Sequence, residues 1–293
     1  MLKMKAILVT GSNGQLGNEL KDLKSLYPFQ FLFTDVNELD ITSTQAIDHF
    51  IQKNQIHYCI NAAAYTAVDK AETDQDIAFL INAKAAENLA LACAKKNIPI
   101  IHISTDFVFD GNQQALYNET SKENPLSIYG KTKLDGEKLV SAANKQSIII
   151  RTAWLYSYYG KNFVKTMLQL AKDRDTLGVV SDQVGTPTYA HDLAKAILDI
   201  ISQIDTAKNP NVYFGLYHYS NEGIASWYDF AKLIFELSGT TINLKPIATS
   251  AYPTPAKRPA YSVLDKSKIT STFHLTIPTW QESLAKCIEK LSK

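Results

Sequence analysis

Short apolar runs that alternate with helical patterns are the feature that most constrains how this chain can fold. Runs typical of buried strands occur at Ala6–Thr10, Phe31–Asp35, Tyr58–Asn61, Pro99–Ser104 and Ser147–Arg151. Helical patterns lie between them, including one at about 15–26 and an alanine-rich one at about 74–96. Strands that alternate with helices form βαβ units, whose parallel sheet is covered on both faces. We therefore expect an α/β fold with a doubly wound parallel sheet.

Three glycines, Gly11, Gly14 and Gly17, follow the first predicted strand directly. A glycine turn between a strand and a helix lets the backbone approach a pyrophosphate, and the helix N-terminus offers free N–H groups to it. The GxxGxxG spacing matches the usual GxGxxG fingerprint only loosely. Asp35, at the end of the second predicted strand, can bind the 2′-hydroxyl of an adenosine ribose. The pattern predicts a Rossmann-like fold that binds NADH or NADPH, and Asp35 favours NADH because a carboxylate repels a 2′-phosphate.

Beyond about Thr152 the alternation loosens, and prolines become denser. Helical patterns persist at about 162–173, 191–204, 226–238 and 279–291. We expect residues 1–152 to form the dinucleotide-binding domain, with 189–214 returning to it. Residues 153–188 and 215–293 would form a smaller C-terminal substrate-binding region that closes over the carboxyl edge of the sheet.

Tyr129 and Lys133 lie four residues apart in a helical pattern, so they would share one face of that helix. A neighbouring ammonium favours the phenolate, so we expect Lys133 to lower the pKa of Tyr129 from about 10 toward neutrality. Thr105 follows the fourth predicted strand, where its hydroxyl could hydrogen-bond a substrate carbonyl. The three residues are predicted to be catalytic, and a phenol tuned in this way would serve carbonyl reduction or alcohol oxidation.

Composition and charge exclude several other functions. The formal net charge is +1 and the basic residues are scattered, so we expect neither nucleic acid nor a membrane as a partner. No apolar run approaches the about 20 residues of a membrane span, and the first apolar run ends too early for a signal peptide. Cys59, Cys93 and Cys287 have neither a metal-ligand nor a disulfide spacing. We expect a cytoplasmic protein with buried, inert thiols and no metal site.

Longer motifs resemble those of a known family. They lie at Asn61–Glu72, Ser104–Phe109, Tyr129–Lys133, Arg151–Trp154, Asp182–Thr188, Trp227–Asp229 and Tyr252–Pro259. Over essentially its whole length the chain resembles the extended short-chain dehydrogenase/reductases. The resemblance implies an enzyme that reduces the C4 keto group of a nucleotide-linked sugar with NAD(P)H. The motifs from Arg151 onward favour dTDP-4-dehydro-L-rhamnose as the sugar substrate that this resemblance implies. The alternatives are another nucleotide-linked 4-keto sugar and a non-catalytic NAD(P)-binding regulatory subunit.

The resemblance also implies roles for individual residues. The expected cofactor contacts are the glycine turn with Gln15 and Leu16 at the pyrophosphate, Asp35 at the adenosine ribose, Asp40 and Ile41 at the adenine, and Ala64, Tyr65 and Thr66 at the nicotinamide half. Tyr129 would donate a proton, and Lys133 would hold the nicotinamide ribose. The expected substrate contacts are Thr105, Asp106 and Trp154 at the sugar and Arg258 at the diphosphate.

The chain departs from the family's pattern in two places. Ile103 and Phe107 stand where relatives often carry tyrosines. Some relatives dimerise through Mg²⁺ held by glutamates. Glu19 matches one such position, but His191 replaces another, which counts against a Mg²⁺-linked dimer. The resemblance therefore leaves a monomer or a homodimer open.

Overall fold

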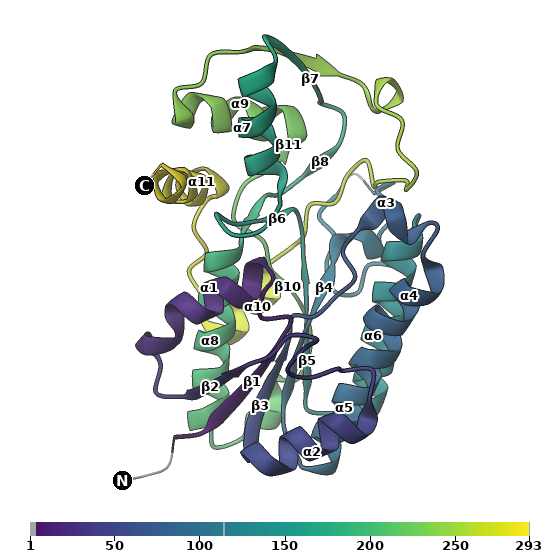
Figure 1. Cartoon of the computed structure of the whole chain (residues 1–293), viewed down its shortest axis with the longest axis vertical. Helices are drawn as coiled ribbons and strands as arrows, with labels where there is room; N and C mark the ends of the chain where they lie inside the picture. The colour runs from purple at the N-terminus through teal and green to yellow at the C-terminus, as the bar shows by residue number, and fades with distance from the viewer. Residues whose placement is uncertain (1–3, 114, 293) are drawn as a thin grey trace.

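A six-stranded parallel sheet forms the centre of the molecule (Figure 1). The computed structural model describes residues 4–113 and 115–292, so residues 1–3, 114 and 293 of the predicted domain ranges lie outside it. The strands are β1 (Ala6–Thr10), β2 (Gln30–Phe33), β3 (Ile56–Asn61), β4 (Ile100–Thr105), β5 (Ser147–Thr152) and β10 (Gly215–His218). Their order is β10-β5-β4-β3-β1-β2, and all neighbours are parallel. The order reverses between β1 and β3, which confirms the predicted doubly wound sheet and creates a crevice there.

Helices cover both faces of this sheet (Figure 1). One face carries α1 (Gln15–Leu23) and α8 (Ala190–Thr206), which pack against each other. The other carries α2 (Thr44–Asn54), α5 (Ala86–Lys95) and α6 (Ile128–Ala143). The helix predicted at 191–204 is confirmed by α8. The helix predicted at 15–26 is also confirmed, since a 3₁₀ turn, η1 (Lys24–Leu26), extends α1 to residue 26.

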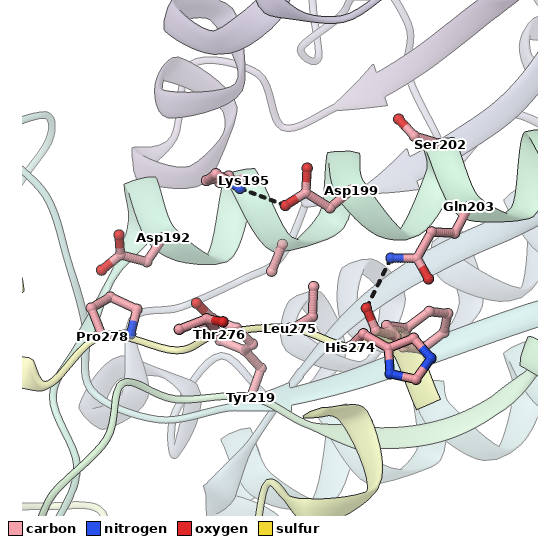
Figure 2. Close-up of a pocket in the computed structure, with 12 residues that line it drawn as sticks. Asp192, Lys195, Asp199, Ser202, Gln203, Tyr219, His274, Leu275, Thr276 and Pro278 are labelled. Atoms are coloured by element: carbon pink, nitrogen blue, oxygen red, sulfur yellow. Dashed lines mark hydrogen bonds and ion pairs between the residues drawn. The ribbon is translucent and has the colours of Figure 1, made fainter. Parts of the chain in front are cut away.

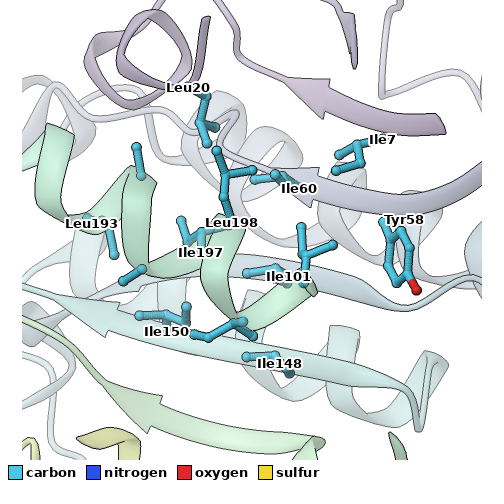
Figure 3. Packing of buried hydrophobic residues seen from close by; sticks show 14 of the residues in the cluster. Ile7, Leu20, Tyr58, Ile60, Ile101, Ile148, Ile150, Leu193, Ile197 and Leu198 are labelled. Atoms are coloured by element: carbon cyan, nitrogen blue, oxygen red, sulfur yellow. The ribbon is translucent and has the colours of Figure 1, made fainter. Parts of the chain in front are cut away.

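The core between the sheet and α8 is built mainly from isoleucine and leucine (Figure 3). Ile7, Ile60 and Ile150 from the strands are completely buried, and so are Leu193 and Ile197 from α8. Branched side chains fit the pleated surface of a strand well. Burying each one contributes about 1.5–3 kcal/mol, so this layer gives the carboxyl edge of the sheet a rigid base.

The alanine-rich helix predicted at 74–96 is present, but it is not a uniform α-helix. It consists of α4 (Gln75–Phe79), a π-helical turn η2 (Leu80–Ala85) and then α5. Asn82 in this turn accepts a hydrogen bond from the Tyr65 backbone N–H and donates to the Thr132 hydroxyl on α6. The π-helical turn thereby joins the loop after β3 to α6.

The helix Gln75–Lys95 also corrects one expectation. It is long and apolar enough to cross a membrane, although the sequence was expected to hold no such segment. Half of its apolar stretch is buried inside the protein, and the helix packs on α6. A core helix of a soluble protein has the same composition, because it is apolar on most of its sides.

A second hydrophobic cluster lies beyond the carboxyl ends of the strands, at the top of Figure 1. Its helices are α7 (Phe163–Asp173), α9 (Trp227–Ser238) and α11 (Trp280–Leu291), which confirms the helices predicted at 162–173, 226–238 and 279–291. Short elements complete the chain: α3 (Val68–Ala71), η3 (Asp106–Val108), β6 (Leu155–Tyr156), β7 (Thr176–Val180), β8 (Val184–Gly185), β9 (Thr188–Tyr189), η4 (Pro210–Tyr213), β11 (Ala225–Ser226), β12 (Asn243–Ile247), η5 (Thr249–Ala251) and α10 (Ser267–Phe273).

The predicted boundary at residue 214 needs correction. Strand β10 pairs with β5 as the edge strand of the main sheet. Ile269 and Phe273 of α10 are buried in the core cluster of that sheet. Both elements lie in the range 215–293 that was assigned to the substrate-binding region. The chain therefore returns to the sheet again after residue 214, because the apolar faces of β10 and α10 complete its core.

Gly136 provides a test of how closely α6 must approach the π-helical turn. A Cβ atom at this position would lie 2.1 Å from the Asn82 carbonyl oxygen. We expect Gly136→Ala to lower the free energy of unfolding by about 1–2 kcal/mol, because the clash outweighs the gain in helix propensity. Urea unfolding measures the change, with Ser141→Ala on the exposed side of α6 as control. A Gly136→Ala variant at least as stable as wild type would show that α6 can move away.

Candidate active site

A cavity of about 870 Å³ lies at the carboxyl edge of the sheet. Thr10, Thr105 and Thr152 line it at the carboxyl ends of β1, β4 and β5. Trp227 and Arg258 line it from the C-terminal half of the chain. The cavity therefore occupies the place where doubly wound sheets bind ligands.

The structure brings the predicted site residues together around this cavity. Those that line it are Gly11, Gly14, Gln15, Leu16, Gly17, Asp35, Asp40, Ile41, Ala64, Thr66, Thr105, Asp106, Tyr129, Lys133, Trp154 and Arg258. Tyr65 differs from its two neighbours, because its phenol turns to Asp74 and donates a hydrogen bond to Oδ2 at 2.9 Å. Any contact of Tyr65 with a ligand in the cavity would thus have to come from its backbone.

The glycine turn after β1 leaves no room for side chains. A Cβ atom on Gly17 would lie 2.4 Å from the Ser12 Cα atom, and one on Gly11, whose φ is +64°, would lie 2.6 Å from the Ala63 backbone. Helix α1 begins immediately after Gly14, which supplies no side-chain cap. The first N–H groups of α1 are thus open toward the cavity, as in a phosphate-binding turn.

Asp35 is held at the rim of the cavity by this turn. The Asn13 backbone N–H donates to Asp35 Oδ2 at 3.0 Å, and the Val36 N–H donates to Oδ1 at 2.9 Å. The carboxylate is therefore fixed beside the glycine turn. This is the position in which an acidic residue meets the ribose of a bound dinucleotide.

Helix α6 carries Tyr129 and Lys133 on the side that faces β4. The hydroxyl of the N-cap residue Ser127 accepts a hydrogen bond from the Gly130 N–H, which fixes the start of the helix one residue before Tyr129. The Lys133 ammonium donates to the Ile103 carbonyl at 2.6 Å. The Phe107 ring meets the Tyr129 ring edge-on, with centroids 5.5 Å apart. Sequence reasoning assigned Phe107 no role, yet it fixes the position of the phenol.

The pKa of Tyr129 does not follow the expectation from the sequence. Burial, with a smaller contribution from the Asp106 charge, raises it to about 12, and hydrogen bonding with Thr105 opposes this only in part. Burial also lowers the pKa of Lys133 to about 8, against the charge of Glu137. Burial disfavours the charged form of both groups, so the phenolate of Tyr129 and the ammonium of Lys133 are each harder to form than in water. Tyr129 is thus a protonated phenol at neutral pH, the form that a proton donor requires.

Asp106 adds a buried carboxyl group next to the phenol. It is 2% exposed, and its Oδ1 accepts a hydrogen bond from Thr105 at 3.1 Å. Burial raises the pKa of Asp106 to about 6, although hydroxyl groups of Ser262 and Thr105 favour the charged form. Among the described residues, no hydrogen-bond partner meets ordinary geometry at the buried Oδ2 atom.

Trp154 lies at the cavity wall in an unusual backbone conformation. Its φ is +47°, a value that costs energy for a large side chain. Its indole ring stacks on that of Trp227, with centroids 3.6 Å apart and planes 7° from parallel. Trp227 is a lining residue to which sequence reasoning gave no role of its own. The two rings form a flat apolar surface suited to the C–H face of a sugar.

Arg258 reaches the cavity from the C-terminal half, but it is paired. Its Nη2 lies 2.9 Å from Asp69 Oδ2, and its Nη1 lies 3.1 Å from Asp69 Oδ1. Hydrogen bonds from Arg258 hold the pKa of Asp69 below its usual range. Asp69 belongs to α3 and was not singled out as a functional residue from the sequence. This ion pair joins the loop at residues 252–259 to the dinucleotide-binding half of the chain.

Comparison with known proteins agrees with this geometry. The family model described as the RmlD substrate binding domain matches residues 4–293. A dTDP-4-dehydrorhamnose reductase from Aggregatibacter actinomycetemcomitans is 43% identical, over 96% of this chain and 97% of its own. The chain belongs to the RmlD family.

Solved structures extend the comparison. The crystal structure of a dTDP-4-dehydrorhamnose reductase from Clostridium acetobutylicum shares 44% identity with a TM-score of 0.92, and covers 98% of this chain and 100% of its own. The Bacillus anthracis dTDP-4-dehydrorhamnose reductase, solved in complex with NADP, shares 37% identity with the same TM-score and the same coverage. The chain therefore has the RmlD-family fold over nearly its full length.

The Mg²⁺ site that was considered from the sequence resemblance does not fit the residues around Glu19. The Glu19 side chain is fully buried, Ser157 donates to its Oε1, and its Oε2 lies 3.0 Å from His191 Nδ1. Both carboxylate oxygens are thus already engaged inside the protein. Over residues 4–113 and 115–292, no group of three or more histidine, cysteine or acidic side chains is arranged to hold a metal ion.

A second cavity, of about 440 Å³, lies along α8, away from the predicted site residues (Figure 2). Lys195 and Asp199 form an ion pair of 2.6 Å across one turn of α8. Gln203 donates to the Phe273 carbonyl at 2.9 Å and so ties the segment after α10 to this helix. These two contacts tie lining residues of the second cavity to one another.

Asp106 yields a prediction about stability and pH. Its carboxyl has a raised pKa, so its contribution to stability is fully present below about pH 4 and is lost as the pH rises through about 6. We expect Asp106→Asn to be more stable than wild type at pH 7, by on the order of 2 kcal/mol, and to differ little at pH 4. Chemical unfolding at both pH values measures this, with exposed Asp173→Asn as control. A variant less stable than wild type at pH 7 would show that the carboxylate is well paired.

Proposed function

We propose that this chain reduces the C4 keto group of dTDP-4-dehydro-L-rhamnose to give dTDP-L-rhamnose, with NADH or NADPH as the hydride donor. This is the last step of dTDP-rhamnose biosynthesis. The observation that carries the proposal is the Tyr129 phenol at the cavity wall, protonated and flanked by Thr105 and Lys133. The identity to reductases of that name, over nearly the whole chain, supports the choice of sugar.

The residues of the cavity suit this reduction. The nicotinamide cofactor supplies a hydride to the carbonyl carbon when bound. Tyr129 then gives its proton to the oxygen as negative charge develops there. The Thr105 hydroxyl and the Lys133 charge stabilise that oxygen and the phenolate that Tyr129 becomes. Trp154 and Trp227 offer an apolar wall to the sugar, Asp106 offers a polar group, and Arg258 is the cation for the diphosphate.

The cofactor preference rests on Asp35. Its carboxylate is fixed by two backbone N–H groups and cannot easily turn away from a ribose 2′-phosphate. We therefore propose that NADH is preferred, although a relative has been solved with NADP. The ratio of kcat/KM for the two cofactors measures the preference.

We further propose that the protein acts in the cytoplasm on a nucleotide-sugar substrate, without nucleic acid or a membrane as partner. The near-neutral charge with scattered basic residues supports this. The residues beyond the carboxyl edge, around α7, α9 and α11, would form its substrate-binding region. A monomer and a homodimer both fit these features, and light scattering after size-exclusion chromatography distinguishes them.

The direct test is a turnover assay. Purified protein is mixed with NADH and enzymatically generated dTDP-4-dehydro-L-rhamnose, and loss of nicotinamide absorbance is followed. Consumption of NADH with formation of dTDP-L-rhamnose supports the proposal. Binding of NADH without turnover would keep the cofactor assignment and move the choice to another nucleotide-linked 4-keto sugar, or to a regulatory subunit.

The same assay tests the proton donor. We expect Tyr129→Phe to lower kcat by about 100-fold or more, because positioned acid–base groups contribute factors of that size. The dissociation constant for NADH should stay within about twofold, since the ring and its packing on Phe107 are kept. Tyr228→Phe on α9, away from the described cavity lining, is the control. A rate near wild type in Tyr129→Phe would remove Tyr129 from the proton-transfer step.

A further inference from the structure

A buried carboxylate lies directly behind the predicted catalytic residues. Glu137 stands one helical turn after Lys133 on α6 and is 4% exposed. Arg151 on β5 binds it twice, with Nε 2.9 Å from Oε1 and Nη2 2.7 Å from Oε2. The Ser104 hydroxyl on β4 donates to the same Oε1. One side chain thus ties α6 to two strands of the sheet.

Ser104 and Arg151, the two strand residues that bind Glu137, lie next to the predicted catalytic residue Thr105. Ser104 immediately precedes Thr105 on β4. Ser104 and Arg151 are register partners in the pairing of β4 with β5. A two-point bond from a guanidinium fixes distance and angle together, which a single contact does not. The distance between Thr105 on β4 and the phenol on α6 therefore depends on the bond to Glu137.

Glu137 also supplies a charge. Its carboxylate raises the pKa of Lys133 against the effect of burial. The other groups near Lys133 and Glu137 do not replace it. His102 on β4 is buried and its pKa is held well below the usual range, so it is neutral. Arg151 is a cation, and Glu123, from the segment before α6, binds Arg151 only at Nη2, a nitrogen that it shares with Glu137.

We propose that Glu137 is a positioning residue for the reduction: it seats α6 against the ends of β4 and β5, and it favours the charged form of Lys133. Glu137 is absent from the cavity lining, so it acts through Lys133 and Ser104 rather than by touching a ligand. The inference rests on the proposed function, because it concerns the same catalytic residues.

A purely stabilising ion pair is the alternative. Breaking a buried pair by removing one partner is strongly destabilising, so Glu137→Ala could fail through unfolding alone. Glu137→Gln keeps the shape and the acceptor for Ser104 while it removes the charge. Glu137→Asp keeps the charge but shortens the reach. Glu123→Gln is the matched control, because it removes a carboxylate from the same guanidinium without releasing α6.

The experiment measures kcat and KM of the full chain from pH 6 to 10, with NADH and dTDP-4-dehydro-L-rhamnose. For Glu137→Gln we expect kcat to fall about tenfold or more with little change in the sugar KM. The alkaline limb of kcat should move to lower pH, because Lys133 loses its proton more readily without the neighbouring carboxylate. Glu137→Asp should return that limb toward the wild-type pH, and Glu123→Gln should leave it in place.

Circular dichroism and thermal unfolding establish that each variant is folded at the assay temperature. Wild-type kcat and an unmoved alkaline limb in folded Glu137→Gln would overturn the proposal. Equal losses in Glu137→Gln and Glu123→Gln would also overturn it, since they would assign the network to stability alone. Failure of the proposed function looks different, because wild type itself would then not turn over this sugar. In that case the pH dependence of NADH dissociation from wild type and Glu137→Gln gives the readout, and identical profiles would count against a role through Lys133.

Discussion

The seating of α6 against the sheet is the constraint on which the site depends. Helix α6 holds the phenol and the ammonium, while β4 holds Thr105, and the two elements are far enough apart in sequence that only tertiary contacts set their distance. Two contacts join α6 to the sheet, namely the bond from Lys133 to the Ile103 carbonyl and the network around Glu137, while the close backbone approach at Gly136 packs α6 against η2. These contacts lie inside the protein, where water weakens hydrogen bonds and charge interactions only a little.

The same enclosure sets the protonation states. A dry environment keeps Tyr129 and Asp106 neutral more readily than water would, and it makes the Lys133 ammonium easier to deprotonate. An enzyme that reduces a carbonyl needs a proton on the phenol before the reaction and a stabilised phenolate after it. Burial therefore favours the protonated phenol that is needed before the reaction. The phenolate that forms afterwards must be stabilised by neighbouring groups inside the cavity.

Much of this arrangement could be predicted from the sequence, because it depends on local patterns. The apolar runs and the glycine turn specify the strands, the sheet and the cofactor edge, and the spacing from Tyr129 to Lys133 specifies a shared helix face. The pKa of Tyr129 could not be predicted in this way, since it depends on burial by segments distant in the chain. The same holds for the pairing of Asp69 with Arg258 and for the stack of Trp227 on Trp154, which join residues more than 70 positions apart. Strand β10 has only four residues, too short a run to be recognised from its sequence, and its place is shown by its pairing with β5 and its contact with α10.

The ion pair between Asp69 and Arg258 has a consequence for how a charged ligand enters. Arg258 already has a carboxylate partner, so a diphosphate that binds it exchanges one anion for another instead of neutralising a free cation. Much of the attraction between phosphate and guanidinium is then offset by the loss of the Asp69 contact, and the net gain is the difference between two similar charge pairs. Such an exchange makes the affinity less sensitive to ionic strength than an open basic pocket would be. A diphosphate at Arg258 would also remove one of the two attachments of the loop at residues 252–259 to α3, the other being the Ala256 N–H that donates to Asp69, so occupancy of the cavity and attachment of this loop would be linked.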